Sequence, residues 1–284
     1  MRLRWPAVAA GLLALLVVAI AALALSCLSL WQTRCSATTL FEGRRPLDVP
    51  YAETRPAVVR RMLQIARVGP SDHVLDLGTG DGRILIAAAR ERGASGLGVD
   101  IDPVLVREAE ANARRAGVAG RVAFRTQDIF ATPLGEATVV TMFLLPEVNL
   151  RLRPRLLAEL RPGARIVSHA FDMGDWRADK IDRVGGSTLY LWRVPARVAG
   201  RWRLSDPTAG DGELAFEQRF QLLSGRWRPE GGGEPRILHG RVDGAFVQIV
   251  VETPGGARTY DGRVEPGLIA PRDGRGRWRA SLVR

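Results

Sequence analysis

The chain has 284 residues, a formal net charge of +11 and a hydrophobic content of 46%. This length allows one sizeable domain, or one domain with a small partner, and the apolar content excludes a mainly disordered chain. A basic balance suits nucleic acid or an anionic membrane, but Lys180 is the only lysine and the arginines are scattered, without a run interleaved with aromatic residues. We therefore expect no nucleic-acid partner and only a weak attraction to anionic lipid.

An uncharged apolar stretch covers residues 7–30, with Trp5 and Trp31 at its ends. As a helix it would be about 36 Å long, which is enough to cross a hydrocarbon core of ~30 Å. Tryptophan suits the membrane interfaces, and the apolar region of a secretory signal is usually shorter, about 7–15 residues. The sequence therefore predicts an uncleaved membrane anchor over residues 1–31 and a linker over residues 32–49, with cleavage before Cys27 as the alternative.

The cysteines and histidines do not suggest a metal centre. Cys27 and Cys35 are the only cysteines, and His73, His169 and His239 are far apart in the sequence. The chain beyond the linker can therefore hold neither a disulfide nor a cysteine-based zinc site, and the histidines show no metal-ligand spacing.

Patterns typical of strands and helices alternate over residues 50–197, which we interpret as one domain. A first helix begins at Pro56, with Thr54 as its expected cap and Gly69-Pro70 as its end. The alternation predicts an α/β fold with a doubly wound, mostly parallel sheet of seven strands. Strands are expected at residues 73–77, 96–100, 122–124, 137–145, 164–171 and 189–194, and further helices at residues 83–90, 103–116 and 152–160.

Short alternating runs separated by turn signals replace this pattern over residues 198–284. They predict a small antiparallel all-β domain, either a sandwich or a barrel. Gly-Arg-Trp-Arg occurs at residues 200, 225 and 276. If these stretches mark a repeat, each tryptophan should face inward and its arginine neighbours outward. The expected strands are residues 202–204, 214–222, 246–251, 259–264 and 278–283.

The stretch Asp76-Leu77-Gly78-Thr79-Gly80-Asp81-Gly82 follows the first strand and precedes a helix. Glycine has no Cβ and takes positive φ, so we expect a ligand to lie against this turn and to meet free N–H groups. The pattern resembles motif I of class I S-adenosylmethionine-dependent methyltransferases, with a nucleotide or NAD site and a ligand-free turn as alternatives. Asp81 is expected to be structural. The predicted cofactor-binding residues of the turn are Asp76, Gly78, Thr79, Gly80 and Gly82.

Acidic residues also follow the next two strands. Asp100 ends the second strand, where the ribose hydroxyls of a nucleoside need a fixed carboxylate acceptor. Asp128 and Ile129 follow the third strand and could accept from the adenine amino group and offer an apolar wall. We therefore assign Asp100, Ile101, Asp128 and Ile129 to the cofactor, with solvated strand-end carboxylates as the alternative, and Asp102 to a helix cap.

Methyl transfer to a nucleophile requires in-line placement and a neutral nucleophile. An amine with a pKa of about 10.4 is mostly charged at pH 7, so the site has to disfavour or remove its proton. Candidate catalytic residues near the mouth of the site are Tyr51, Glu147, His169 and Asp172. The alternatives are a satisfied core histidine for His169 and a helix cap for Glu147.

A more specific resemblance covers roughly residues 48–195. It is carried by residues 48–54, the glycine turn with residues 81–84, Phe-Leu-Leu-Pro-Glu at residues 143–147, and Ser-His-Ala-Phe-Asp-Met-Gly-Asp-Trp at residues 168–176. These stretches resemble bacterial relatives of the membrane-anchored ATP synthase c-subunit lysine methyltransferases, which implies protein-lysine N-methylation with S-adenosylmethionine as cofactor. Ala52-Glu53 stand where that family usually has Val-Pro, and the β region after Pro195 is absent from its mitochondrial members.

The first functional hypothesis is therefore a methyltransferase that acts on lysine in a membrane-associated protein. Because S-adenosylmethionine is a cytoplasmic metabolite, we expect the large domain to lie on the cytoplasmic side of the membrane. The second hypothesis keeps the cofactor but has a small molecule or a lipid as acceptor. The third is a non-catalytic, membrane-tethered binding protein.

Overall fold

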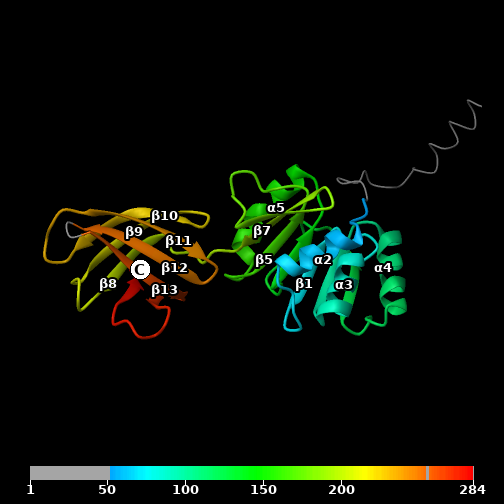
Figure 1. Cartoon of the computed structure of the whole chain (residues 1–284), viewed down its shortest axis with the longest axis horizontal. Helices are drawn as coiled ribbons and strands as arrows, with labels where there is room; N and C mark the ends of the chain where they lie inside the picture. Colours follow the sequence, from blue (N-terminus) through cyan, green and yellow to red (C-terminus); the bar gives the residue numbers. More distant parts are fainter. Residues whose placement is uncertain (1–51, 254–255, 284) are drawn as a thin grey trace, which may run out of the picture. The chain divides into compact units, whose positions relative to one another are not determined.

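A computed structural model describes residues 52–253 and 256–283. The predicted anchor over residues 1–31, the linker over residues 32–49 and Tyr51 lie outside the described residues. Within the described part of the chain, no helix is long and apolar enough to cross a membrane. A sheet with flanking helices comes first in the described chain, and a β-barrel follows it in sequence (Figure 1).

The first sheet has seven strands in the order β3-β2-β1-β4-β5-β7-β6. Neighbouring strands from β3 to β5 pair in parallel, and β7 runs antiparallel to both β5 and β6. The strand order reverses between β1 and β4, which is where open α/β sheets bind ligands. This mixed, mostly parallel sheet confirms the predicted α/β class. The strands are β1 (His73–Leu77), β2 (Ser95–Asp100), β3 (Val122–Thr126), β4 (Val139–Met142), β5 (Arg165–His169), β6 (Lys180–Val184) and β7 (Ser187–Arg193).

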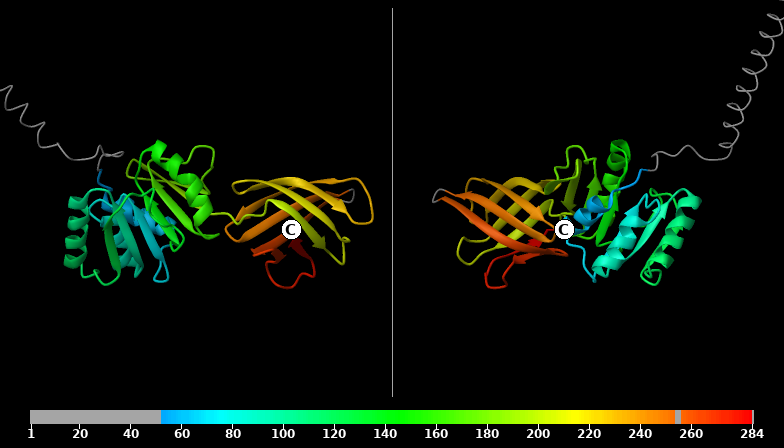
Figure 2. Two further views of the ribbon diagram at one scale, coloured as in Figure 1. Left: turned by 180° about the vertical axis from the view of Figure 1, so that it is seen from behind. Right: turned by 45° about the vertical axis from the view of Figure 1, so that its right-hand side comes forward.

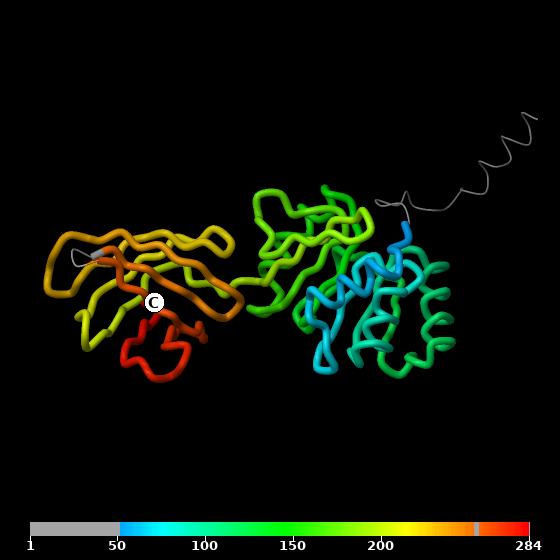
Figure 3. The backbone as a smooth tube through the Cα atoms, in the orientation of Figure 1, coloured from blue at the N-terminus to red at the C-terminus, as the bar shows by residue number. Residues whose placement is uncertain are grey.

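Helices cover both faces of this sheet (Figures 1 and 3). Side chains of α2, α3 and α4 form one buried cluster with one face, and those of α5 form a second cluster with the other face. Val139 belongs to the first cluster and its neighbour Val140 to the second, because successive side chains of a strand point to opposite faces. The apolar run of β4 is therefore buried on both sides. The helices are α2 (Pro56–Ile65), α3 (Arg83–Arg92), α4 (Pro103–Arg115) and α5 (Pro146–Glu159).

Two helix starts differ from the prediction. Helix α2 begins at Pro56, but Arg55 is its N-cap residue and no side chain caps it. The expectation that Thr54 caps this helix is wrong, because its hydroxyl pairs with His169 instead. Helix α5 begins at Pro146 rather than at residue 152, and β4 is correspondingly shorter than expected. Proline has the fixed φ that suits a first helical position, so it starts a helix as well as ending a strand.

Strand β6 was not expected. Residues 189–194 were predicted to close the sheet, whereas β7 lies inside it, between β5 and β6. The sequence of β6 carries little burial signal: Ile181 is 57% exposed, and charged residues surround it. Edge strands commonly have such a pattern, because they have a neighbour on one side only.

The C-terminal strands form a closed antiparallel barrel, in the order β10-β11-β12-β13-β14-β15-β8-β9 (Figure 2). This confirms the barrel alternative of the predicted all-β domain. The single strand expected over residues 214–222 is two strands, because Phe220 takes a φ of 54° and turns the chain. The strands are β8 (Gly200–Ser205), β9 (Gly212–Arg219), β10 (Leu222–Pro229), β11 (Arg236–Asp243), β12 (Phe246–Thr253), β13 (Gly256–Glu265), β14 (Leu268–Pro271) and β15 (Arg279–Leu282).

The tryptophans of the Gly-Arg-Trp-Arg stretches pack in the barrel core. Trp202 and Trp227 are buried, and the arginines on either side of each are exposed or only partly buried, as expected. Trp278 comes just before β15, is only partly buried and meets the ring of Tyr260 at 5.1 Å between centroids. The buried Tyr260 hydroxyl donates to Asp206 at 2.9 Å, so the interior also holds a satisfied polar pair.

Candidate active site

The glycine turn after β1 is bonded to the end of β2. The N–H groups of Gly78 and Thr79 both donate to the carbonyl of Val99 at 2.9 Å, and that of Gly80 donates to Asp100 Oδ2 at 2.9 Å. The N–H of Gly82 donates to the carbonyl of Thr79. The expectation of free turn N–H groups facing a ligand is therefore wrong for these residues. The neighbouring strand satisfies them and fixes the shape of the turn.

The glycines of the turn are required by packing within the protein. All three have left-handed φ, at 75° for Gly78, 54° for Gly80 and 81° for Gly82. A Cβ on Gly78 would lie 2.9 Å from a methyl carbon of Leu144, and one on Gly82 would lie 2.8 Å from the ring of Phe124. Side chains from β3 and from the segment after β4 thus occupy the space that a side chain would need at these two positions.

Asp76, at the end of β1, is buried beneath the turn. Its Oδ2 accepts from the Thr79 hydroxyl at 2.8 Å, and its Oδ1 accepts from the Thr141 hydroxyl at 2.6 Å. Burial raises the pKa of this carboxyl to about 6, against the two hydroxyl contacts that lower it. Asp76 therefore ties the turn to β4. Thr141, which the sequence reasoning missed, lies inside an apolar strand and had no visible partner in the sequence.

Asp100 joins the ends of β1, β2 and β3. In addition to the Gly80 bond, its Oδ1 accepts from the N–H of Asp102 at 3.0 Å, and its backbone carbonyl accepts from Gln127 at 2.8 Å. Each carboxylate oxygen has two acceptor positions, so one on each remains for a ligand. Asp102 accepts from Val104 N–H at 2.8 Å, which confirms it as the cap of α4.

Asp128 and the two isoleucines lie at the same strand ends. Asp128 is exposed, and its Oδ1 accepts from the N–H of Phe130 at 2.8 Å. Ile101 is 43% exposed and Ile129 is half-buried. Both are apolar side chains that solvent or a ligand can reach. The structure thus brings the predicted cofactor residues of β1, β2 and β3 to one edge of the sheet.

The ends of β4 and β5 carry aromatic rings instead of acids. The ring of Phe143 lies 3.9 Å from that of His169 and 6.4 Å from that of Phe171, between centroids. His169 is buried, and its Nδ1 lies 3.3 Å from the Thr54 hydroxyl. Burial, helped by the nearby Arg55, lowers the pKa of His169 below its ordinary value. The imidazole is therefore neutral at pH 7.

The other predicted catalytic residues are not members of this ring cluster or lie outside the described chain. Glu147 is an exposed residue in the first turn of α5, where its charge suits the helix dipole. Asp172 is also exposed, and its Oδ1 accepts from Gly174 N–H at 3.0 Å. Asn149, missed from the sequence, donates to the carbonyls of Phe171 and Asp172 at 3.2 Å each and holds this loop. Tyr51 is not among the described residues.

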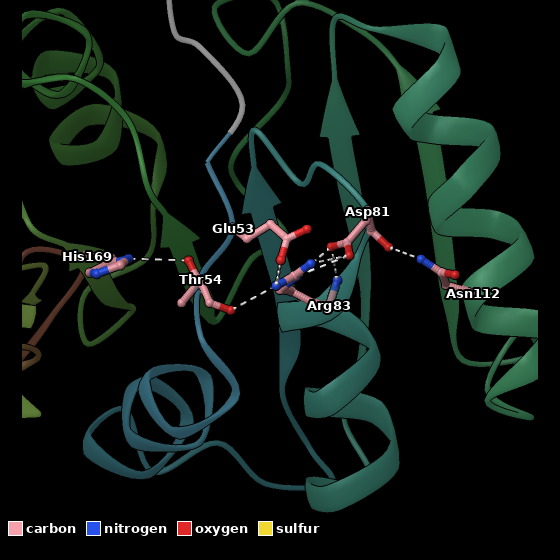
Figure 4. A network of polar contacts seen from close by, with 6 residues as sticks. All are labelled: Glu53, Thr54, Asp81, Arg83, Asn112 and His169. Atoms are coloured by element: carbon pink, nitrogen blue, oxygen red, sulfur yellow. Dashed lines mark hydrogen bonds and ion pairs between the residues drawn. The ribbon is translucent and has the colours of Figure 1, made fainter. Parts of the chain in front are cut away.

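A short segment before α2, residues 53–55, lies between the glycine turn after β1 and His169 of the ring cluster (Figure 4). Arg83, at the start of α3, binds the carboxylate of Asp81 at 2.6 Å, that of Glu53 at 3.1 Å and the carbonyl of Thr54 at 3.2 Å. Thr54 in turn reaches His169. We call residues 53–55 the strap. Asp81 acts through Arg83 and the start of α3, as its structural assignment predicts.

The comparisons with known proteins agree with this geometry. The family model of the ANTKMT methyltransferase domain matches residues 76–180. The chain is 46% identical over 151 residues to a protein-lysine N-methyltransferase of Saccharolobus islandicus strain REY15A, and the match covers 51% of this chain and 94% of that protein. The chain belongs to the S-adenosylmethionine-dependent methyltransferases, in the family of that enzyme. This methyltransferase is also 31% identical over 180 residues to the ATP synthase c-subunit lysine N-methyltransferase of Mus musculus, covering 63% of the chain and 71% of that protein.

A solved structure supports the cofactor. An RNA methyltransferase from Salinibacter ruber, in complex with S-adenosyl-L-homocysteine, is 50% identical, with a TM-score of 0.51, and the match covers 52% of this chain and 96% of that one. The cofactor of this methyltransferase is S-adenosylmethionine, and the non-catalytic hypothesis is wrong. The residues present fit it: Asp100, at the end of β2 and beside the glycine turn, has one spare acceptor position on each carboxylate oxygen.

Proposed function

We propose that this methyltransferase methylates the side-chain nitrogen of lysine in a protein. The identity of 46% to a protein-lysine N-methyltransferase, across 94% of that enzyme, carries the proposal. The ring cluster at the ends of β4 and β5 supports it, because its apolar faces exclude water from an entering side chain.

The ends of β1 to β3 hold the cofactor in this proposal. Asp100 accepts from the ribose hydroxyls with its two spare acceptor positions, and Ile101 covers the base from one side. Asp128 and Ile129 border the adenine from the end of β3. Asp76, Thr79 and the glycines act one layer below, by fixing the turn on which the cofactor lies.

S-adenosylmethionine supplies a methyl group on a sulfonium sulfur, and its transfer to an amine releases one proton. The lysine side chain enters past Phe143 and Phe171, where the rings replace water around it. Removal of water lowers the pKa of an amine, so the neutral nucleophile becomes more populated. Burial keeps His169 neutral, so the imidazole adds no positive charge beside the entering amine. Thr54 holds the imidazole in place.

The site of action follows from the N-terminal segment. Residues 1–31 form a membrane anchor in this proposal, and the catalytic domain lies on the cytoplasmic side with its cofactor. The substrate is then a protein in or at the membrane. Protease treatment of sealed, inside-out vesicles should degrade the C-terminal domain, and protection of that domain would contradict this orientation.

Two other acceptors have some support. A small molecule or a lipid would fit the same apolar passage. RNA is favoured by one specific observation, the identity of 50% to a solved RNA methyltransferase. The aromatic cluster could also stack on a base.

The location of the transferred methyl group tests all three acceptors. The purified full-length protein is incubated with tritium-labelled S-adenosylmethionine, cell membranes and total RNA, with Asp100→Ala as the inactive control. We expect the label in protein, as methyl-lysine after acid hydrolysis. Label that ribonuclease releases, or that organic solvent extracts, would contradict the proposal in favour of RNA or lipid.

A further inference from the structure

A groove of about 450 Å³ lies between helices α2, α3 and α4, outside the strand-end site. Its floor is apolar and includes Val59 from α2 and Ile86 and Ala87 from α3, all of them buried. Ala87 is small, which leaves room above α3 between the two neighbouring helices. None of the described residues that line the groove is aromatic.

Arginines line this groove in excess over acids. Arg83 and Arg90 have carboxylate partners within the groove, in Asp81 at 2.6 Å and Glu91 at 3.4 Å. The two remaining arginines of the lining, Arg60 and Arg115, have no carboxylate partner among the described residues: Arg60 is exposed, and Arg115 contacts the neutral amide of Asn112. In the described chain, two guanidinium groups without counter-charges therefore border an apolar floor.

The groove is connected to the active site by the network in Figure 4. Asn112, in the groove, donates to the carbonyl of Asp81 at 2.9 Å, and Asp81 holds Arg83. Arg83 contacts the strap at Thr54, whose hydroxyl reaches His169. A partner that contacts Arg83 in the groove would therefore be separated only by Thr54 of the strap from the ring cluster that borders the acceptor lysine.

We propose that this groove binds an acidic segment of the protein substrate. The proposal rests on the proposed function, because it supposes a protein acceptor. Arg60 and Arg115 pair with carboxylates of the segment, and Val59 and Ile86 take an apolar side chain between them. A guanidinium matches a carboxylate with two parallel hydrogen bonds, which gives both affinity and orientation. The segment thereby brings its neighbouring lysine to the strap.

The groove fits a peptide better than the other anionic partners. Single-stranded nucleic acid binds along a basic track with stacked aromatic rings, and no described groove residue supplies a ring. An anionic membrane presents a flat surface, whereas this site is a recess with buried apolar side chains at its floor. Both nevertheless serve as competitors in the test.

The direct test measures binding of a fluorescein-labelled octapeptide of glutamate and leucine to the full-length protein by fluorescence anisotropy, without cofactor. Arg60→Glu/Arg115→Glu should weaken binding about tenfold or more, because two charge pairs become repulsive. The control is Arg107→Glu/Arg125→Glu, which changes the net charge equally at two exposed arginines outside the groove lining, and should change affinity less than about twofold. Unfolding midpoints check that both variants fold.

Three outcomes would overturn the proposal: no peptide binding by the wild-type protein, equal losses in the two variants, or displacement of the peptide by an RNA oligonucleotide or phosphatidylglycerol vesicles more readily than by unlabelled peptide.

A second measurement compares methyl transfer to a lysine peptide with and without an acidic extension. The extension should lower KM for the wild type and not for Arg60→Glu/Arg115→Glu. Failure of methyl transfer to any polypeptide would contradict the proposed function and leave the binding result standing.

Discussion

The two halves of the active site are built from different side chains. The ends of β1, β2 and β3 carry carboxylates whose oxygens bond to backbone N–H groups or to hydroxyls of the protein. The ends of β4 and β5 carry aromatic rings and a buried, neutral histidine. The first half, which we call the cofactor half, is thus a rigid frame of charge-assisted hydrogen bonds. The second, which we call the acceptor half, is an apolar wall.

This difference corresponds to two chemical tasks. A cofactor with ribose hydroxyls needs acceptors held in place, and in the proposed function Asp100 supplies them while it also accepts from the N–H of Gly80. An amine that must lose its proton needs surroundings that disfavour charge, and in the proposed function Phe143 and Phe171 provide them. Substitutions in the two halves should therefore affect different measured quantities.

The largest effect is expected for Asp100→Ala. It removes two acceptors for the ribose and one partner of the glycine turn, so the affinity for S-adenosylhomocysteine should fall by about 4 kcal/mol, roughly a thousandfold. Titration calorimetry measures it. Asp102→Asn is the control, because asparagine still caps α4 and Asp102 is not among the proposed cofactor-binding residues. A loss of less than about threefold in Asp100→Ala would contradict the assignment.

Asp76→Asn should change the pH dependence of stability. The pKa of Asp76 is raised from 3.8 to about 6 in the folded protein, which therefore holds this proton more tightly than the unfolded chain. Its stabilising contribution is full below about pH 4 and is lost as the pH rises through about 6, a change of about 3 kcal/mol. Asparagine lacks this titration. Urea unfolding of the cofactor-free proteins between pH 4 and pH 7 should show the two curves diverging by that amount, and parallel curves would refute the interpretation.

Gly82→Ala tests whether packing requires the glycines of the cofactor half. Gly82 and Gly117 have similar φ, 81° and 70°, but a Cβ would meet Phe124 and Ala109 at Gly82 and nothing within 4 Å at Gly117. Gly117→Ala should cost about 1 kcal/mol from backbone strain alone. Gly82→Ala should cost about 2 kcal/mol more from overpacking. Urea unfolding compares the two, and equal costs would show that the turn can relax.

Phe143→Ala should weaken the acceptor half alone. Loss of the ring opens the wall to water and removes the ring contact with His169, so we expect kcat/KM to fall about tenfold, or about 1.4 kcal/mol. The affinity for S-adenosylhomocysteine should stay within about twofold of the wild type, since Phe143 is not among the proposed cofactor-binding residues. Phe246→Ala, in a barrel residue that is 37% exposed, is the matched control. A tenfold loss of cofactor affinity would mean that the two halves are not separate.

The smallest effect is expected for His169→Gln. The pKa of His169 is lowered by burial, so its neutral form contributes stability above the unfolded pKa of about 6.5, and this contribution is lost as the pH falls. Wild-type stability should therefore decline below about pH 6.5 more than that of His169→Gln. Thermal unfolding at pH 5.5 and pH 7.5 measures the difference. A more acid-sensitive glutamine variant would contradict a buried, neutral imidazole.

The sequence predicted the parts of this molecule whose causes are local. A proline at a helix start, an acid before it, and glycines after an apolar run act over a few residues, so the helix α4, its cap Asp102 and the turn after β1 were predictable. The alternation of strands and helices also placed Asp76, Asp100 and Asp128 at one edge of the sheet. The wrong expectations, such as the cap at Thr54, arose where a local role competed with a distant partner.

Only the tertiary structure decided how the distant residues meet. The N–H groups of the turn are satisfied by Val99 and Asp100, Thr54 reaches His169, and β7 inserts between β5 and β6. The bonds of the turn, the contact of Thr54 with His169 and the pairing of β7 with β5 join segments that are far apart in the chain, whereas β6 and β7 are consecutive strands. Contacts between distant segments leave no periodic pattern in either segment. The closure of the barrel is of the same kind, because it depends on the pairing of β8 with β15 and not on the composition of either strand.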